Sequence, residues 1–530
     1  MNWFAIVSFA VVLVAIYLYA YYRSKNVNTH DSEGYFLGGR SLVGTTVGMS
    51  IIMTNLSTEH LVGQNGQSYV AGVEVMAWEV TAAVAIVLSA WVFLPRYFKY
   101  GVNTISDFIE VRYDTMTKRI VSILFMFTYT VSFMPVVLYS GSLIFNDLFN
   151  IGGFLGVSTM TSVVIIASFI GIIGVFYLFV GGLSLVAHSD SIYGIGLFIG
   201  GISVTILGIM ALGDSSFLSG VDRFVSESSD KLNAWGAVDS EIVPWPTLFF
   251  GMFFNNLYFW CTNQMIVQKA LAAKNLKEAQ KGTMLVGFFK VFGIFFLVIP
   301  GIIAFSMFGN DLQMDMAYPA LLAEVLPQWA FGIFGVVVFG AIMSSFIGAL
   351  NATVTLFSLD FYKPIINKQA NNRQIARMGR ILTIAVGIVV IIIAPLISLF
   401  PQGLFAVIQE FNGLYNMPLL AIILIGFFSK KTSALGAKVT FVFHVITYSL
   451  SKVVLEDIHY LYVWSVLFIL DIVILYLFSS LKPDKVDFEF EKYKNKVDLT
   501  PWKHSKWVGT IILLTVVAMY IIFSPLVLAK

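Results

Sequence analysis

The sequence has 530 residues, of which 58% are hydrophobic and only 12% are charged, and its mean hydropathy is +0.84. Ordinary soluble domains carry about 25% charged residues, so this composition excludes a soluble globular protein and indicates a chain that crosses a membrane many times. The net charge of +2 gives no reason to expect a nucleic-acid partner, and the single cysteine, Cys261, excludes an intrachain disulfide framework and a cysteine-based metal site.

Fourteen segments are long and apolar enough to cross a bilayer as helices, because a span needs about 20 residues. They comprise residues 2–22, 42–66, 73–96, 120–146, 159–181, 191–213, 246–268, 283–307, 328–358, 381–400, 403–428, 433–453, 459–480 and 507–528. The first segment lacks a positively charged start and a small-residue cleavage site, so we expect a retained helix rather than a signal peptide. The sequence therefore predicts an all-α membrane protein with 14 transmembrane helices.

The distribution of Lys and Arg predicts the orientation of these spans. If the N-terminus lies outside and the spans alternate, 27 of the 32 basic residues fall on the inner side. Basic residues concentrate on the cytoplasmic side of membrane proteins. We therefore expect both termini outside, in a plasma membrane of the bacterial inner-membrane type.

The second span contains TNLSTEHLVGQNGQ (residues 54–67), which places polar side chains and two glycines at membrane depth. Unpartnered backbone groups are costly in lipid, so this stretch indicates a helix broken around a protein-lined cavity. Five spans later, GMFFNNLYFWCTNQMIVQ (residues 251–268) again interrupts an apolar run. Secondary transporters carry such breaks in two repeats of opposite topology.

The two breaks predict an inverted five-helix repeat inside a single membrane transporter domain, residues 1–530. Residues 42–213 and 246–428 form the two expected repeats, residues 2–22 an extra first helix, and residues 433–528 three additional helices. The alternative is that the polar residues only hold neighbouring helices together, which is common in membranes. Two clusters at symmetry-related places favour the repeat.

Two charged residues lie in the middle of predicted spans, Glu79 in VMAWEVTAA and Lys290 in VGFFKVFGIFF. A charge at the bilayer centre costs about 2.5–3.5 kcal/mol on insertion scales, so each indicates a functional site. The alternatives are a side chain that reaches the membrane surface and a purely structural ion pair.

Five stretches carry a resemblance to a known family: STEHLVGQNG, GGLSLVAHSD, LYFWCTNQMIVQKALAAKN followed by EAQKG, AIMSSFIGALNATVTLFSLDFYK, and VIQEFNGLYNMP. In this order and spacing they resemble the sodium/solute symporter family, and within it the sodium/glucose and sodium/galactose cotransporters. The resemblance covers the second to the thirteenth span. It implies the inverted-repeat fold of amino-acid transporters such as the bacterial leucine transporter.

The resemblance also implies Na⁺ as the coupling ion and a site for it. The family's ligands match the backbone carbonyls of Met53, Leu56 and Ala341 and the hydroxyls of Ser344 and Ser345. Oxygen ligands suit a hard cation, and an unwound helix frees carbonyls to supply them. Asp190 matches the family's acid beside the ion's exit path, and its alternative interpretation is a helix N-cap.

The sugar contacts of the family match His60, Glu79, Asn256, Lys290 and Gln409, with Asn55 nearby. These groups are suited to the hydroxyls of a neutral hexose, which donate and accept hydrogen bonds. Phe259 stands where the family has a tyrosine that closes the pocket, and Ala82 where it has a serine contact. Trp260 is expected either to stack on a sugar face or to pack between helices.

We therefore expect a sodium-coupled symporter that imports a glucose- or galactose-like monosaccharide by alternating access. One Na⁺ per sugar is expected, because Ile347 and Gly348 replace the hydroxyls with which some family members hold a second ion. The alternatives are another neutral polyol such as myo-inositol, or a membrane sugar sensor without transport. A sensor is disfavoured, because the sequence offers no appended signalling domain. The longest expected cytoplasmic segment, residues 481–506, is too short to fold as one. We expect no enzymatic activity and no obligate protein partner. The expected partners are the small neutral sugar and the lipid bilayer.

Overall fold

The computed structural model describes residues 3–399, 404–484 and 498–529. The described part is all-helical and contains no β-strand, which confirms the predicted fold class. Residues 2, 400 and 403 of the predicted spans and residues 485–497 of the segment 481–506 lie outside the described residues.

The first half of the chain contains α1 (Trp3–Ser24), α2 (Ser32–Leu37), α3 (Gly44–Asn55), α4 (Asn65–Ala71), α5 (Ala77–Leu88), α6 (Leu94–Tyr100), α7 (Ile105–Arg112), α8 (Thr115–Thr128), α9 (Met134–Phe149), α10 (Ile151–Leu155), α11 (Thr159–Leu212) and α12 (Phe217–Glu227). The second half contains α13 (Gly251–Thr262), α14 (Gln264–Leu271), α15 (Leu276–Phe292), α16 (Ile294–Leu297), α17 (Ile299–Phe308), α18 (Ala317–Val325), α19 (Ala330–Phe357), α20 (Asn372–Ile393), α21 (Leu404–Gly413), α22 (Asn416–Phe428), α23 (Ala434–Val454), α24 (Tyr460–Leu481) and α25 (Ser505–Ile522). Short 3-10 and π-helical turns join several of them.

Among the described residues, nine helices are long and apolar enough to cross a membrane, or ten if a bent pair counts as one span. The predicted count of fourteen is not confirmed by this criterion. Two reasons are physical: α11 runs through two expected spans across a kink at Gly182 (φ 55°), and α13 and α14 are each too short alone.

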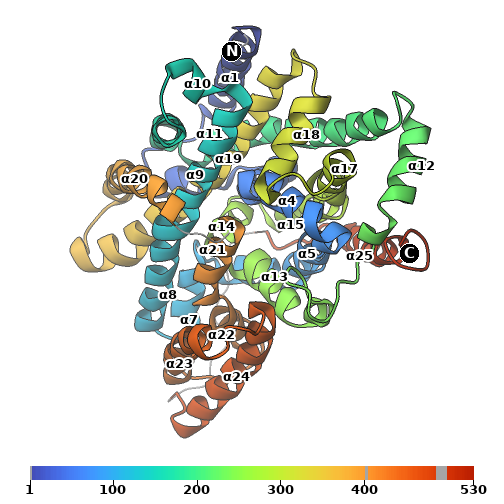
Figure 1. Ribbon diagram of the computed structural model, residues 1–530. Helices are drawn as coiled ribbons and strands as arrows, with labels where there is room; N and C mark the ends of the chain where they lie inside the picture. Colours follow the sequence, from blue (N-terminus) through green and yellow to red (C-terminus); the bar gives the residue numbers. More distant parts are fainter. Residues whose placement is uncertain (1–2, 400–403, 485–497, 530) are drawn as a thin grey trace.

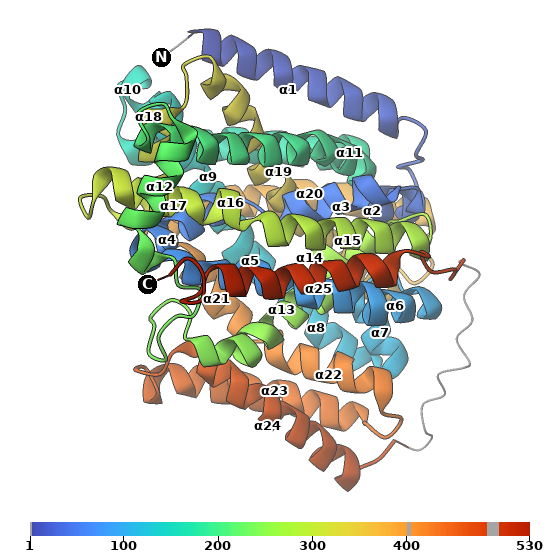
Figure 2. The same cartoon turned by 90° about the vertical axis from the view of Figure 1, so that its right-hand side faces the viewer.

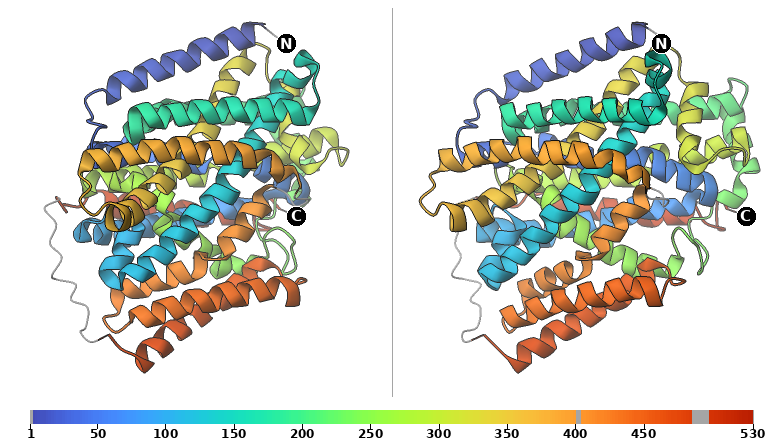
Figure 3. Two further views of the ribbon diagram at one scale, coloured as in Figure 1. Left: turned by 90° about the vertical axis from the view of Figure 1, so that its left-hand side faces the viewer. Right: turned by 60° about the vertical axis from the view of Figure 1, so that its left-hand side comes forward.

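The long helices run side by side, with α1 along one edge of the bundle and α23 and α24 along the opposite edge (Figures 1 and 2). α11 lies between α1 and α20 (Figure 3). α19 is the central helix, since 94% of its most apolar stretch is buried, against 17% for α1. A helix that is apolar on all sides fits such an interior position. α1 begins and α25 ends at the same end of the bundle (Figure 2).

Both predicted helix breaks are present. α3 ends at Asn55, where Leu56 takes an extended conformation, and a π-type turn (Glu59–Gln64) and α4 follow. α13 ends at Thr262, and the extended Asn263 separates it from α14. Two more breaks were not predicted. The α15–α17 segment is bent by 52°, and α21 stops at Gly413 before α22 begins.

Side chains of α4 satisfy the backbone groups that the bend after α15 sets free. The amide of Asn65 donates to the Phe296 carbonyl at 3.3 Å and accepts from the Gly301 N–H at 2.9 Å. The Ser68 hydroxyl donates to the Val298 carbonyl at 2.8 Å. Irregular backbone inside a membrane needs such partners, so α4 and the bend support each other.

α3 and α15 pack at backbone distance. A Cβ on Gly48 would lie 2.7 Å from the carbonyl oxygen of Gly282, and a Cβ on Gly282 would lie 2.7 Å from the carbonyl oxygen of Gly44. The Gly44 N–H also donates to the Glu278 carboxylate at 2.7 Å. Small residues allow this approach, as they do between helices in membranes generally.

Candidate functional site

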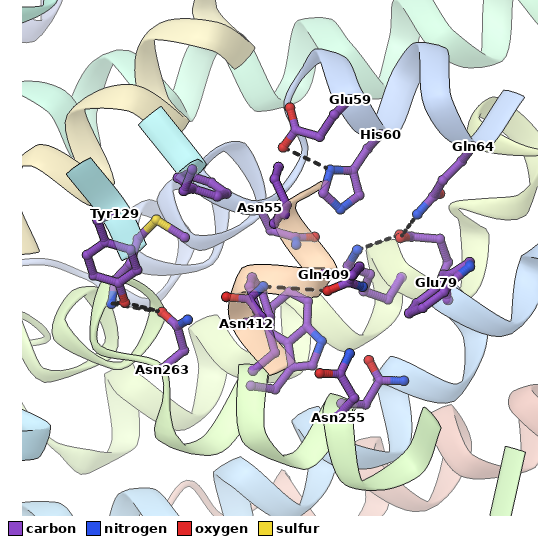
Figure 4. Close-up of a pocket in the computed structure, with 18 residues that line it drawn as sticks. Asn55, Glu59, His60, Gln64, Glu79, Tyr129, Asn255, Asn263, Gln409 and Asn412 are labelled. Carbon is purple, nitrogen blue, oxygen red and sulfur yellow. Dashed lines mark hydrogen bonds and ion pairs between the residues drawn. The ribbon is translucent and has the colours of Figure 1, made fainter. Parts of the chain in front are cut away.

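The helix breaks surround one cavity. All eight predicted substrate residues line it: Asn55, His60, Glu79, Asn256, Phe259, Trp260, Lys290 and Gln409. They come from the two predicted breaks, from α5 and α15, and from α21. Figure 4 draws the lining side chains as sticks, and Asn55, His60, Glu79 and Gln409 are labelled among them.

The two charges in mid-span form an ion pair in the wall of this cavity. Lys290 Nζ lies 2.5 Å from Glu79 Oε2, and the two residues are 2% and 1% exposed. Gln64 Nε2 donates to the other carboxylate oxygen of Glu79 at 3.0 Å (Figure 4). Both charges are buried inside the protein and paired with each other, which argues against side chains that extend to the membrane surface. Removing one partner of a buried pair leaves an uncompensated charge, which is strongly unfavourable.

Uncharged amides supply most of the remaining polar surface. Asn256 Nδ2 donates to the Thr81 hydroxyl at 2.8 Å, and Asn412 Nδ2 lies 3.5 Å from Gln409 Oε1. The Oδ1 atom of Asn55 is buried without a hydrogen-bond partner among the described residues. Amide groups both donate and accept, so this wall presents both functions to a bound molecule.

Aromatic rings form the apolar part of the wall. Trp260 lines the cavity, its ring 5.3 Å from that of Phe259 and 5.2 Å below Lys290 Nζ. This position places Trp260 at the cavity and not only between helices. Ala82 is buried in α5 and does not line the cavity.

The sequence interpretation missed several lining residues: Glu59, Gln64, Trp78, Tyr129, Phe133, Asn255, Asn263, Met265, Ile408 and Asn412. Glu59 Oε1 lies 3.5 Å from His60 Nδ1 (Figure 4). Gln64 and Asn263 stand inside the polar stretches that revealed the breaks, so the same signal was present for them. Tyr129 gave no such signal, because its role depends on a contact with Asn263, reached at 2.8 Å.

The cavity is contracted around these side chains. Its free volume is about 60 Å³, which admits a few water molecules but not a hexose ring. Entry of a sugar-sized molecule therefore requires lining side chains to move.

A buried histidine holds the break that precedes α22. His444 Nε2 donates to the carbonyl of Gly413, the last residue of α21, at 2.9 Å. His444 Nδ1 lies 2.8 Å from Asp471 Oδ2, and both side chains are fully buried. Because the Gly413 carbonyl only accepts, Nε2 carries a hydrogen, and Asp471 fixes the ring in this orientation. α21 also carries Gln409, so the pair positions one wall of the cavity.

Three of the five predicted sodium ligands lie together where α3 meets α19. The Ser345 hydroxyl donates to the carbonyls of Met53 and Thr54 at 3.2 and 2.9 Å. Ser344 Oγ lies 3.3 Å from Thr54 Oγ1. Leu56 is at the end of α3, and Ala341 precedes Ser345 by one turn on the buried helix α19. These oxygen atoms fit a hard cation, which takes carbonyl and hydroxyl ligands.

Asp190 lies inside α11 and is 1% exposed, so it does not cap a helix. It pairs with Lys269 of α14, whose Nζ lies 3.0 Å from Asp190 Oδ2. The sequence interpretation placed Lys269 at the start of a cytoplasmic loop, but the side chain is 1% exposed. α14 turns this side chain into the interior, and its burial was not predicted from the sequence.

Neither Ile347 nor Gly348 supplies a side-chain oxygen, and Gly348 has no room for a side chain. Both residues are buried in α19, and a Cβ on Gly348 would lie 2.7 Å from Thr54 Cγ2. A side chain at position 348 would therefore collide with Thr54 of α3.

The chain is similar to known proteins over most of its length. The family model described as the sodium:solute symporter family matches residues 35–443. An uncharacterized symporter, YidK, of Escherichia coli strain K12 is 40% identical over 521 residues, which is 98% of this chain and 91% of that protein. The sodium/glucose cotransporter of Vibrio parahaemolyticus is 31% identical, with 78% of each chain covered. The sodium/myo-inositol cotransporter of Bos taurus is 27% identical, covering 90% of this chain and 73% of that protein.

The fold is also similar to that of a solved Na⁺-coupled sialic acid symporter, in a substrate-bound, outward-open state. The TM-score is 0.78 at 19% identity, with 92% of this chain and 100% of the other covered. At this identity the likeness concerns the fold alone.

Proposed function

Because this chain belongs to the sodium:solute symporter family, we propose that it imports a neutral monosaccharide, glucose- or galactose-like, together with Na⁺ by alternating access. Its family and structural neighbours are transporters rather than enzymes. The proposed site for the solute is the cavity between the helix breaks.

The observation that carries the proposal is the buried Glu79–Lys290 pair facing a wall of amides. The two charges sum to zero, which favours a neutral solute over an anion or a cation. A carboxylate accepts from two hydroxyls and an ammonium donates to others, and hydrogen bonds to charged groups are the stronger ones. Trp260 and Phe259 supply the flat apolar surface that the ring face of a sugar requires.

α3 provides the proposed link between ion and solute. Met53 and Leu56 at its end are proposed to hold Na⁺ with Ser344 and Ser345, and Asn55 between them lines the cavity. An ion that fixes the end of α3 therefore also fixes Asn55. Such coupling is reciprocal, so the solute strengthens Na⁺ binding by the same factor.

A second candidate solute is myo-inositol, a neutral ring of hydroxyls that the same groups would accept. The likeness to a sodium/myo-inositol cotransporter supports it. A sensor that binds sugar without moving it is the remaining alternative. We place the protein in a plasma membrane of the bacterial inner-membrane type with both termini outside. The location of the start of α1 and the end of α25 at one end of the bundle supports a shared side for the two termini, and the distribution of Lys and Arg is the reason for choosing the outside.

Uptake into proteoliposomes tests the proposal. Labelled hexoses, pentoses, amino sugars and inositols are offered with an inward Na⁺ gradient and with K⁺ in its place. We expect Na⁺-dependent accumulation of one or a few neutral solutes. Binding without accumulation would favour the sensor, and Na⁺-dependent uptake of charged solutes alone would contradict the proposed site.

A further inference from the structure

A buried lysine lies directly beside the proposed sodium ligands. Lys269 on α14 is 1% exposed. Its Nζ lies 2.8 Å from the hydroxyl and 3.0 Å from the carbonyl of Ser50, 3.0 Å from Asp190 Oδ2, and 3.5 Å from Ser344 Oγ. These oxygen atoms belong to α3, α11 and α19. The ammonium group thus joins four helices at one point.

The surroundings of this ammonium have the composition of a cation site. One carboxylate, two hydroxyls and one carbonyl are the oxygen donors that hard metal ions take from proteins. Ser50 also donates to Asp190 at 2.5 Å, which orders the carboxylate. Ser344 belongs both to this cage and to the proposed sodium site, so the two cation positions are neighbours.

We propose that Lys269 is a tethered cation: its ammonium fills a second cation position formed by Ser50, Asp190 and Ser344, and so limits the protein to one free Na⁺. The inference deepens the proposed function, because it names the group that sets the ion stoichiometry. Ile347 and Gly348 lack side-chain oxygens, but Asp190 and Ser50 are well placed to hold an ion, and Lys269 occupies that place.

Because they remove charges of opposite sign, Lys269→Ala and Asp190→Asn are expected to change Na⁺ binding in opposite directions. Lys269→Ala leaves Asp190 and the hydroxyls to a free ion and removes a positive charge from the neighbourhood of Ser344. Asp190→Asn leaves the ammonium without its counter-charge, so it repels Na⁺ at the neighbouring site. An ion bound at Ser344 lies within about 6 Å of Lys269 Nζ. At that distance one unit charge changes the affinity for Na⁺ about tenfold, for an effective dielectric constant between those of the protein interior and water. A merely structural pair would instead weaken Na⁺ binding in both variants.

Equilibrium binding of radiolabelled Na⁺ to the purified full-length protein tests the inference without any solute. We expect one Na⁺ per parent chain, two for Lys269→Ala and one again for Lys269→Ala with Asp190→Asn. Asp190→Asn alone is expected to bind one Na⁺ about tenfold more weakly. Lys281→Ala removes a lysine that pairs with Glu278 on α15 outside the cage and serves as the matched control.

A Lys269→Ala protein that binds no more Na⁺ than the parent would overturn the inference, as would weaker binding of the same number of ions. Lys269→Gln carries the same expectation if the alanine variant does not fold. A parent that binds no Na⁺ contradicts the proposed function. In that case a gain of one ion in the lysine variants still supports the tethered cation, so the two failures are distinguishable.

Discussion

Neutralising the Glu79–Lys290 pair provides a direct test of the proposed solute site. Lys290→Met removes the ammonium and keeps most of the side-chain volume, and Glu79→Gln removes the carboxylate charge with little change in shape. If both groups bind the solute, each variant loses a charged hydrogen bond worth about 1.5–3 kcal/mol. That is roughly a tenfold to hundredfold loss of affinity.

The double variant separates binding from structure. Either single change leaves an unpaired charge in the interior, because the partners are 1% and 2% exposed, and breaking a buried pair costs about 3–5 kcal/mol of stability. Removing both charges restores neutrality, and replacing a whole buried pair is often neutral. A purely structural pair therefore predicts recovery of uptake in Glu79→Gln with Lys290→Met. A solute-binding pair predicts that the double variant folds but stays inactive.

The assay is initial Na⁺-driven uptake in proteoliposomes over a range of solute concentrations. Size-exclusion chromatography checks that each variant is folded, and Lys281→Ala, on the same helix α15 but paired with Glu278, controls for loss of a lysine. Uptake within twofold of the parent for both single variants, or full recovery in the double variant, would refute the reasoning.

Three further predictions concern the gate, the ion count and the break before α22. Phe259→Tyr adds a hydroxyl at the cavity wall, where one hydrogen bond is worth about 0.5–1.5 kcal/mol. We expect slower efflux of the solute from preloaded vesicles. Unchanged or faster efflux would contradict a gate at Phe259. The parent protein should move one Na⁺ per solute, measured as the reversal potential of the solute-coupled current, and a ratio near two would contradict both this stoichiometry and the occupation of the second cation position by Lys269. His444→Leu should destabilise the detergent-solubilised protein by about 3–5 kcal/mol, because it leaves the buried Asp471 carboxylate without its partner. His444→Leu with Asp471→Leu should recover part of this loss in a thermal melt. A melting temperature of His444→Leu equal to the parent's would count against the pair.

Sequence and structure agree where a local pattern carries the information. Polar side chains inside apolar runs located the breaks at Leu56 and Asn263, and the two isolated charges located the cavity. The bend after α15 has no polar pattern, because VFGIFFLVIPG is apolar, and Pro300 is the local signal that could have indicated it. Its partner Asn65 lies 231 residues away along the chain from Phe296. The burial of Lys269 was not predicted for the same reason. Its burial depends on Ser50, 219 residues distant in sequence, and no local spacing reveals such a contact.

The glycine contact between α3 and α15 has a mechanical consequence. α3 carries Met53 and Asn55, α15 carries Lys290, and their backbones touch at Gly48 and Gly282. Helices in such close contact cannot slide past each other without losing the contact. We therefore expect α3 and α15 to move as one rigid unit. Flexing then falls on the extended joints at Leu56 and Asn263. Met53 on the ion side and Asn55 and Lys290 on the solute side would then move together. The cavity would open by displacement of the opposite wall, α13 and α21.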